Sequence, residues 1–513
     1  MTAKVQITRM ELDPDICYRA LAARDPRFDG RFFVAVSTTG IYCRPICPAR
    51  TPYRDNCTFY STAAAAQEAG YRPCLRCRPE TAPSIGAWRG TSNTVSRALV
   101  LIESGALDDG DVEALAARLG VGGRQLRRLF QEHLGASPLA VAQTRRILLA
   151  KQLIHETGLP MTEVAMAAGF GSTRRFNDTF QRLFDRPPSA LRRRGAGRDG
   201  STLELTLAYK PPYDWDAILG FLAARAIPGV ETVSPQCYRR TFAHGTLAVS
   251  HEPERRRLRI ALRLGDVGAL PSILLRVRRV FDLGADPESI AAHLSGDPLL
   301  APLVARRPGL RLPGGWDGFE MAVRAVIGQQ ITIAGARNLL GKLVAAYGVP
   351  ISGGAEGLTH VFPSPEHLVD AEIAALGMPG ARGRAISSMA RAALADPSLF
   401  ERAASLDEAI EKLCAVPGIG DWTAHYIAIR ALREPDGFPA SDIGLLRALA
   451  EEGVRPSPKQ VLVRAEAWRP WRAYAAQHLW THDFAQPPAR KGKKIETLAR
   501  KIAVADRNDP ARL

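Results

Sequence analysis

The sequence contains no run of about 18 uncharged apolar residues, so we expect no segment to span a membrane. The amino-terminal stretch also lacks an apolar segment, because acidic residues follow at Glu11, Asp13 and Asp15, and this excludes a signal peptide there. Cysteine is scarce, with 8 residues in 513, which is too few for a disulfide framework. These absences together predict a cytoplasmic protein without a membrane partner.

Acidic residues are outnumbered by basic ones. Lysine and arginine total 68 against 52 aspartates and glutamates, which gives a formal net charge of +16 at pH 7. A surplus of this sign favours polyanionic partners such as nucleic acid. Hydrophobic residues make up 46% and charged residues 23%, as in ordinary folded domains, and 513 residues at about 150 per domain suggest three or four domains.

The cysteines are unevenly distributed. Six of the 8 fall within the first 77 residues, and four of these form two close pairs, Cys43 with Cys47 and Cys74 with Cys77. Two such pairs separated by a loop can close a tetrahedral thiolate site, for which Zn²⁺ is the natural occupant. On spacing alone, a purely structural zinc site is the simpler interpretation. The alternative is chemical, because an electron-rich thiolate can attack an alkyl group while it remains a ligand.

The stretches that carry these cysteines, TTGIYCRPICPAR and YRPCLRCRPE, resemble the zinc domain of the Ada adaptive-response family over about residues 10–80. The resemblance implies irreversible transfer of a methyl group from a DNA methylphosphotriester to Cys43, with the four paired cysteines as ligands of one Zn²⁺. Methylation removes a negative charge beside the phosphates, so we expect it to raise DNA affinity and to activate transcription. The resemblance also implies contacts with the DNA backbone from Thr39, Arg50, Arg72 and Arg76.

Residues 86–194 carry two copies of a helical pattern, each with an apolar stripe, a glycine-containing turn and an arginine-rich second helix. Periodicity alone fits two ordinary helical hairpins. The second copy, AMAAGFGSTRRFNDTFQRLFDRPPSALRR, resembles the AraC family of DNA-binding domains, with Asp185 where that family usually carries glycine. The resemblance implies two helix-turn-helix motifs that face successive segments of a DNA groove. The residues that would face DNA are Arg124, Gln125, Arg127, Arg128, Thr173, Arg174, Arg175 and Asn177.

A glycine-rich turn, VPGIG at 416–420, separates two predicted helices in the carboxy-terminal half. Free backbone N–H groups at the start of the second helix are suited to an anion, so Gly418 and Gly420 are predicted to grip a DNA phosphate in a helix-hairpin-helix. Asp442 follows the Gly/Pro-rich segment 437–441. Without the hairpin, the simpler interpretation of Asp442 is the N-cap of the next helix.

Three stretches resemble the AlkA family of alkylbase DNA glycosylases, in the helix-hairpin-helix superfamily, over about residues 202–487: YKPPYDWDAILGFLAARAIPGVE, GLRLPGGWDGFEMAVRAVIGQQ and VPGIGDWTAHYIAIR. The resemblance implies that Asp442 is catalytic. Bifunctional relatives carry a Schiff-base lysine where this chain has Trp422, so water is the expected nucleophile and no strand cleavage is expected. Trp422, Tyr426 and Trp480 match the aromatic residues that bind a flipped, cationic base, although aromatic residues at helical positions are more often core.

The resemblance to the AlkA family also implies roles for Gln330 and for three backbone carbonyls in and beside the glycine-rich turn. Gln330 falls where the family inserts a wedge between bases, a position at which AlkA proteins carry an apolar residue. The backbone carbonyls of Cys414, Val416 and Ile419 fall where the superfamily's hairpin holds a monovalent cation. The Pro-Cys-His-Arg motif that marks the carboxy-terminal methyltransferase of full Ada proteins is absent from the sequence, so direct repair of O6-alkylguanine is not expected.

The expected fold is multidomain, mainly α with α+β parts. Its predicted parts are a small zinc-bound α/β methyl-acceptor domain (1–85), an AraC-type double helix-turn-helix domain (86–194), a linker (195–201), a β-rich AlkA N-terminal-like domain (202–312), an all-α helix-hairpin-helix glycosylase domain (313–490) and a basic tail (491–513). We expect a monofunctional glycosylase for bases of the 3-methyladenine and 7-methylguanine type, fused to a methylation-switched transcription activator. The alternative is a transcription regulator whose glycosylase half only docks on DNA. The expected partners are double-stranded DNA, both alkylated DNA and promoter DNA, and RNA polymerase. The protein is expected to be a monomer.

Overall fold

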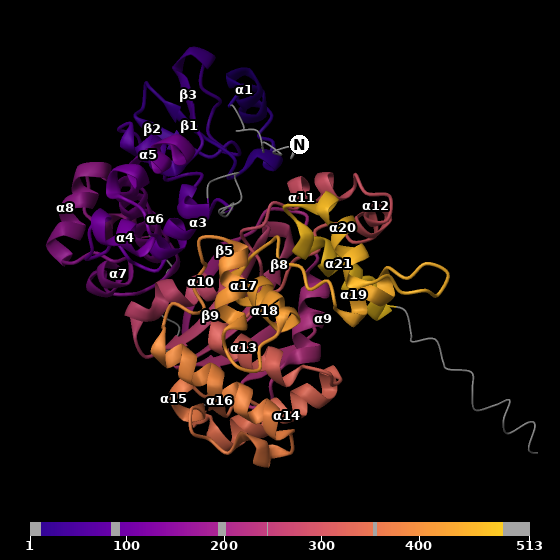
Figure 1. Ribbon diagram of the computed structural model, residues 1–513. Helices are drawn as coiled ribbons and strands as arrows, with labels where there is room; N and C mark the ends of the chain where they lie inside the picture. The colour runs from indigo at the N-terminus through magenta and orange to yellow at the C-terminus, as the bar shows by residue number, and fades with distance from the viewer. Residues whose placement is uncertain (1–11, 84–92, 193–201, 244, 352–356, 486–513) are drawn as a thin grey trace, which may run out of the picture.

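The computed structural model describes residues 12–83, 93–192, 202–243, 245–351 and 357–485. The predicted linker at 195–201 and the predicted basic tail at 491–513 lie outside these residues. Figure 1 shows the indigo and purple amino-terminal half beside a central sheet, with the orange and yellow helices of the carboxy-terminal half around the sheet's other sides. The multidomain, mainly helical fold with sheet parts agrees with the prediction. Within the described ranges, no helix combines the length and apolar character needed to cross a bilayer.

The first domain is a small sheet with two helices. Its strands pair in the order β3-β1-β2-β4, and only the pair β2–β4 is parallel. The Cys74 N–H donates to the Tyr42 carbonyl (3.0 Å), which brings the second cysteine pair beside the first. The elements are α1 (Pro14–Ala22), β1 (Phe33–Val36), β2 (Ile41–Cys43), β3 (Cys57–Tyr60), α2 (Ala63–Glu68) and β4 (Arg72–Pro73).

Two helix-turn-helix units follow, and the long helix α6 joins them. The second helix of each unit is amphipathic: α5 buries Leu126 and Phe130, whereas α8 buries Phe176 and Phe180, and both helices turn their arginines outward. The helices are α3 (Asn93–Glu103), α4 (Val112–Arg118), α5 (Gly123–Leu134), α6 (Pro138–Glu156), α7 (Met161–Ala167) and α8 (Thr173–Phe184).

The third unit is built on an antiparallel sheet in the order β5-β9-β8-β7-β6. Strand β5 alternates buried leucines with more exposed polar residues, and Leu205 lies opposite Ile260 of β9. The elements are β5 (Thr202–Ala208), α9 (Trp215–Arg225), β6 (Glu231–Ser234), β7 (Cys237–Phe242), β8 (Gly245–Glu252), β9 (Arg257–Leu264), α10 (Leu270–Val280), α11 (Pro287–Leu294) and α12 (Leu300–Arg306).

The last unit is almost entirely helical, with one short ladder between β10 (Val349–Pro350) and β11 (His360–Val361). A π-helical turn, Ala428–Leu432, extends α18. Turns of this kind are rare and often mark functional sites. The helices are α13 (Gly318–Ile327), α14 (Ile333–Tyr347), α15 (Pro365–Leu368), α16 (Gly380–Ala395), α17 (Leu406–Cys414), α18 (Asp421–Ile427), α19 (Ile443–Ala448), α20 (Pro458–Ala465) and α21 (Arg472–Ala485).

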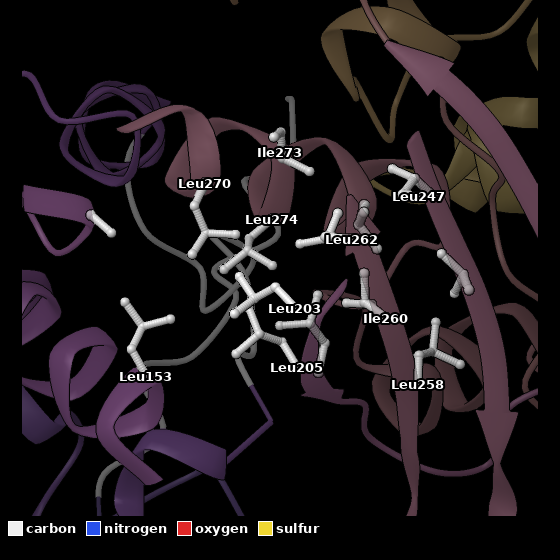
Figure 2. Close-up of a cluster of buried hydrophobic side chains, with 14 of the residues drawn as sticks. Leu153, Leu203, Leu205, Leu247, Leu258, Ile260, Leu262, Leu270, Ile273 and Leu274 are labelled. Atoms are coloured by element: carbon white, nitrogen blue, oxygen red, sulfur yellow. The ribbon is translucent and has the colours of Figure 1, made fainter. Parts of the chain in front are cut away.

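One hydrophobic core joins the helix-turn-helix domain to the five-stranded sheet. Figure 2 shows Leu153 of α6 facing Leu203 and Leu205 of β5, with α10 covering them through residues that include Leu270 and Leu274. All five side chains are at most 9% exposed. Because apolar surface on either side of this junction would otherwise meet water, the two domains stabilise each other.

Helix α6 also reaches the cysteine-bearing domain through a buried lysine. Lys151 Nζ donates to the Cys74 carbonyl (2.8 Å) and pairs with Glu80 Oε2 (2.7 Å). Burial alone would raise the pKa of Glu80, but hydrogen bonding to His155 and the Lys151 charge lower it to about 2. At the carboxy-terminal end of α6, Glu156 Oε2 accepts from the Thr206 N–H of β5 (3.0 Å). The helix therefore contacts the cysteine domain and the five-stranded sheet at once.

Asp185→Gly is expected to raise the free energy of unfolding by about 0.5–1 kcal/mol. Asp185 ends α8 in the left-handed region (φ +54°), whereas α5 ends in the same way at Gly135 (φ +67°), where the absence of a Cβ removes the strain. Urea unfolding followed by circular dichroism measures the change. As a matched control, Asp178→Gly changes an exposed residue in the middle of α8 and is expected to lower the free energy of unfolding by about 0.5–1 kcal/mol. An Asp185→Gly variant no more stable than wild type would contradict the assignment of strain.

Candidate functional site

The first candidate site is the cluster of four cysteines. The sulfur atoms of Cys43, Cys47, Cys74 and Cys77 all lie within 4.8 Å of one another, and none of these cysteines is in a disulfide. The Arg44 N–H donates to the Cys77 sulfur (3.3 Å), and such a bond favours the thiolate. Sulfurs around a tetrahedral zinc ion with bonds of ~2.3 Å lie ~3.8 Å apart, so the cluster fits Zn²⁺. These four cysteines form a zinc site, as predicted.

Exposure distinguishes one cysteine from the other three. Cys43 is partly exposed at the end of β2, whereas Cys47, Cys74 and Cys77 are buried. Among the predicted DNA-backbone residues of this domain, Thr39, Arg50 and Arg76 are exposed, and Arg72 is half-buried.

The eight predicted groove residues lie on two helices. Arg124, Gln125, Arg127 and Arg128 of α5 are all exposed, with Arg127 pairing to Glu113 (2.9 Å). On α8, Arg174, Arg175 and Asn177 are exposed, and Thr173 is half-buried just after the N-cap Ser172. An exposed ion pair of this kind is weak, so Arg127 remains available to a phosphate.

The glycine-rich turn lies between α17 and α18. Gly418 has φ +90°, which favours glycine, and a Cβ there would also clash with the Ala385 side chain at 2.4 Å. Both the backbone conformation and the packing therefore require glycine at this position. Gly420 is the N-cap of α18, and both glycines are exposed. The Val416 carbonyl accepts from the Ile419 N–H (3.1 Å) within the turn. The turn thus presents backbone to solvent at the start of α18.

Asp442 lies within reach of the aromatic residues predicted to accompany it. Trp422 Nε1 donates to Asp442 Oδ2 and Trp480 Nε1 donates to Asp442 Oδ1, each at 2.8 Å. Tyr426 stacks on Trp422 with centroids 5.3 Å apart and meets Trp480 edge-on at 6.3 Å. All four side chains are half-buried. The structure therefore brings one carboxylate and three aromatic rings together at the surface.

Asp442 is also the N-cap of α19. Its Oδ1 accepts from the backbone N–H groups of Gly444 (2.9 Å) and Leu445 (3.0 Å) in addition to the Trp480 indole. Oδ1 therefore receives three donors, whereas one hydrogen bond, from Trp422, reaches Oδ2. The cap and the aromatic surroundings, which the sequence offered as alternatives, coexist.

A buried arginine behind the aromatic rings is a feature that the sequence analysis missed. Arg430 is 2% exposed, and its guanidinium carbon lies 5.5 Å from the Tyr426 ring centroid and 5.2 Å from that of Trp480. Burial lowers the pKa of Arg430 to about 10. The spacing of four residues from Tyr426 to Arg430 on one helix is the signal that could have indicated this contact.

Gln330 lies exposed in the turn between α13 and α14, in the left-handed region with φ +54°. The preceding residue holds this turn. Gln329 Nε2 donates to Thr423 Oγ1 (2.9 Å), and Arg382 donates to the Gln329 carbonyl (2.6 Å). The predicted wedge residue thus lies on a turn tied to α18.

A hollow of about 340 Å³ lies elsewhere, at the junction of α6 with β5 and β9. Its charged lining residues pair with one another, as in Arg78–Glu156 (2.8 Å) and Arg257–Glu252 (2.6 Å). None of the predicted site residues lines it.

Three family models match the chain in succession. The model of the metal binding domain of Ada matches residues 16–80, that of a helix-turn-helix domain matches residues 115–194, and that of the AlkA N-terminal domain matches residues 204–317.

Curated relatives match either nearly the whole chain or one part of it. A Mycobacterium tuberculosis protein described as a probable bifunctional transcriptional activator/DNA repair enzyme AlkA is 45% identical over 497 residues, which cover 94% of this chain and 100% of the relative. The DNA-3-methyladenine glycosylase 2 of Escherichia coli is 36% identical over 55% of this chain and 98% of its own length. The bifunctional transcriptional activator/DNA repair enzyme Ada of Escherichia coli is 37% identical over 31% of this chain and 43% of its own length.

Stability is expected to fall as the pH is lowered from about 6.5 to about 4, because His478 of α21 is 7% exposed and burial lowers its pKa to about 4. The folded protein therefore binds this proton more weakly than the unfolded chain, in which the pKa is about 6.5. The free energy of unfolding is fully retained above that pKa and falls as the pH is lowered toward the folded-state pKa, by up to about 3 kcal/mol. Thermal unfolding across this range measures the effect. The variant His478→Gln is expected to show a shallower pH dependence, whereas an unchanged slope would contradict the role of His478.

Proposed function

Because the chain belongs to the family of bifunctional transcriptional activators and DNA repair enzymes of the AlkA type, we propose that its carboxy-terminal half excises alkylated bases from DNA while its amino-terminal half is a methylation-switched regulator. The substrates of the first activity are bases of the 3-methyladenine and 7-methylguanine type. The observation that carries it is the convergence of the Trp422 and Trp480 indoles on the Asp442 carboxylate beside Tyr426.

Asp442 supplies the negative charge that excision needs. The nucleotide is flipped out of the duplex, and its C1′–N bond breaks with the electron pair passing to the base, which neutralises the alkylated ring. Positive charge then develops on the sugar, where a fixed carboxylate stabilises it. Water adds its oxygen to C1′ and gives its proton to the carboxylate, so the products are a free base and an abasic sugar.

The two oxygens of Asp442 have different roles in this proposal. Three donors fix Oδ1, whereas one hydrogen bond from Trp422 leaves Oδ2 with spare acceptor capacity. Oδ2 is therefore the oxygen that faces the sugar and the attacking water. Because position 422 is tryptophan rather than lysine, no Schiff base forms and the DNA strand is not cut.

The aromatic rings select the leaving base. Trp422, Tyr426 and Trp480 offer π faces to a cationic ring, and such contacts contribute roughly 0.5–2 kcal/mol. Arg430 already occupies one side of Tyr426 and Trp480, so the flipped base stacks on their outer faces. Gln330, on its tied turn, fills the gap that the flipped nucleotide leaves.

Cys43 is the proposed methyl acceptor because it is the partly exposed sulfur of the cluster. Its thiolate attacks the methyl carbon of a methylphosphotriester, so an S–C bond forms while a C–O bond breaks and the electron pair stays on the phosphate as a diester anion. Bound Zn²⁺ would keep all four cysteines deprotonated. The thioether cannot return the methyl group, so each chain reacts once.

DNA contacts follow from the exposed surfaces. In this proposal the backbone residues of the zinc domain and the α5 and α8 residues bind promoter DNA, and the Gly418–Gly420 turn grips a phosphate near the lesion, with carbonyls of Cys414, Val416 and Ile419 around a monovalent cation. These residues are Thr39, Arg50, Arg72, Arg76, Arg124, Gln125, Arg127, Arg128, Thr173, Arg174, Arg175 and Asn177. The domain boundaries at 85, 194, 201, 312 and 490, monomeric action, a cytoplasmic location and recruitment of RNA polymerase belong to the same proposal.

Asp442→Asn is expected to reduce 7-methylguanine release by at least about 100-fold, because the charge opposite the sugar is lost, while DNA affinity stays within about threefold. Chromatography of bases released from methylated duplex and a gel-shift titration measure the two effects. The exposed Asp370→Asn serves as the matched control and is expected to excise normally. Retained excision in Asp442→Asn would refute the assignment, and a wild-type chain that binds but never excises would favour the docking-module alternative.

Incubation with methylated DNA is expected to add one methyl group to the zinc-loaded chain, on the peptide that contains Cys43. Mass spectrometry of the digested protein locates the group. Cys43→Ala is expected to abolish uptake, whereas Cys57→Ala, which removes a buried thiol outside the cluster, is expected to leave it intact. A methyl group found on Cys47, Cys74 or Cys77 would move the acceptor.

A further inference from the structure

The segment that carries Asp442 is fixed at several points before it reaches the site. Arg402 Nε donates to Glu434 Oε1 (2.9 Å), and Arg472 Nε donates to Asp436 Oδ1 (2.8 Å). Phe438 is 1% exposed, and its ring meets Trp468 edge-on at 5.9 Å. Residues 433–442, called the strap below, therefore run from the π-helical end of α18 to Asp442 as an anchored segment rather than as a free loop.

The strap lies directly against α18. A Cβ at Gly437 would lie 2.8 Å from the Ile429 side chain, so the backbone passes the helix with no space between them. At the next residue, the Phe438 N–H donates to His425 Nδ1 (3.2 Å). His425 stands on α18 between Trp422 and Tyr426 in sequence. One hydrogen bond thus connects the helix that carries two of the aromatic rings to the strap that carries the carboxylate.

This bond requires an unprotonated Nδ1, because a protonated imidazole has no acceptor nitrogen. Burial lowers the pKa of His425, and Arg472 of α21 lowers it further. Three carboxylates oppose this: Asp421 on the same helix, 3.6 Å from Nε2 and 69% exposed, Asp407 on α17 and Asp436 in the strap. The acceptor form therefore prevails at neutral pH and is lost in acid.

We propose that His425 is a positioning residue of the glycosylase, which sets the distance between the Asp442 carboxylate and the aromatic rings, and that its protonation releases the strap and slows excision. The inference rests on the proposed excision activity. His425 touches neither base nor sugar, and it acts through the Phe438 backbone.

Single-turnover excision of 7-methylguanine from duplex DNA by the zinc-loaded full chain, between pH 5 and pH 8.5, tests the proposal. His425→Asn places an amide oxygen where Nδ1 stood, so it keeps the acceptor without the titration. It is expected to stay within about threefold of the wild-type rate at pH 8 and to lose the wild type's fall in rate below about pH 6. His425→Leu has no acceptor and is expected to be about 10-fold slower or more at every pH, because small misplacements of catalytic groups are costly.

Three outcomes would overturn the positioning role: a His425→Leu rate equal to wild type at pH 8, a His425→Asn profile that keeps the wild-type acid limb, or a wild-type rate that stays flat to pH 5. Thermal unfolding and affinity for an abasic-site duplex report whether each variant is folded. If His425→Leu does not fold, the pH profile of His425→Asn still decides whether His425 has the positioning role. Asp442→Asn in the same assay separates the two levels. If it excises normally, the proposed function fails, whereas if it is inactive and the His425 variants behave as wild type, the positioning role alone fails.

Discussion

The carboxylate of Asp442 is the point on which the carboxy-terminal half depends. Two indole N–H groups from α18 and α21 and two backbone N–H groups from α19 all end on it. Each of these helices is thereby fixed relative to the other two, so the hydrogen bonds that orient the carboxylate also hold the aromatic rings in place. Removing the charge while keeping the shape is therefore more informative than truncation, because truncation would also remove a helix cap.

The two halves of the chain pack against each other, and helix α6 makes the contacts that join them. Helix α6 buries Leu153 against β5, binds the Cys74 carbonyl through Lys151 and meets the Thr206 N–H through Glu156. Buried charges of this kind are tolerated because they are paired and hydrogen-bonded. The outward faces of α5 and α8 stay free of this junction, so the regulator can be tied to the repair enzyme without covering the helices proposed to bind DNA.

Patterns local in sequence were predicted well. The cysteine spacing indicated the zinc site, because two close pairs need only a loop to bring their sulfurs together. The stripe of Phe176 and Phe180 indicated the buried face of α8, since helical periodicity depends on near neighbours. His425 and Arg430 escaped notice. The spacing of four residues between Tyr426 and Arg430 is local, but the contacts of His425 with Phe438 and of Arg430 with Trp480 have no local pattern, because they depend on how the strap and α21 return to α18.

By itself, the sequence determined which residue types this protein has for metal binding, for DNA and for excision, since side-chain chemistry and spacing along one helix or turn are written in the chain. Only the tertiary structure decided that Asp442 is both a helix cap and the neighbour of three aromatic rings, and that Oδ2 is the oxygen with acceptor capacity to spare. It also decided that the regulator packs on the sheet of the repair half. These outcomes depend on contacts between residues far apart in the chain, and burial and hydrogen bonding select such contacts only when the whole fold closes.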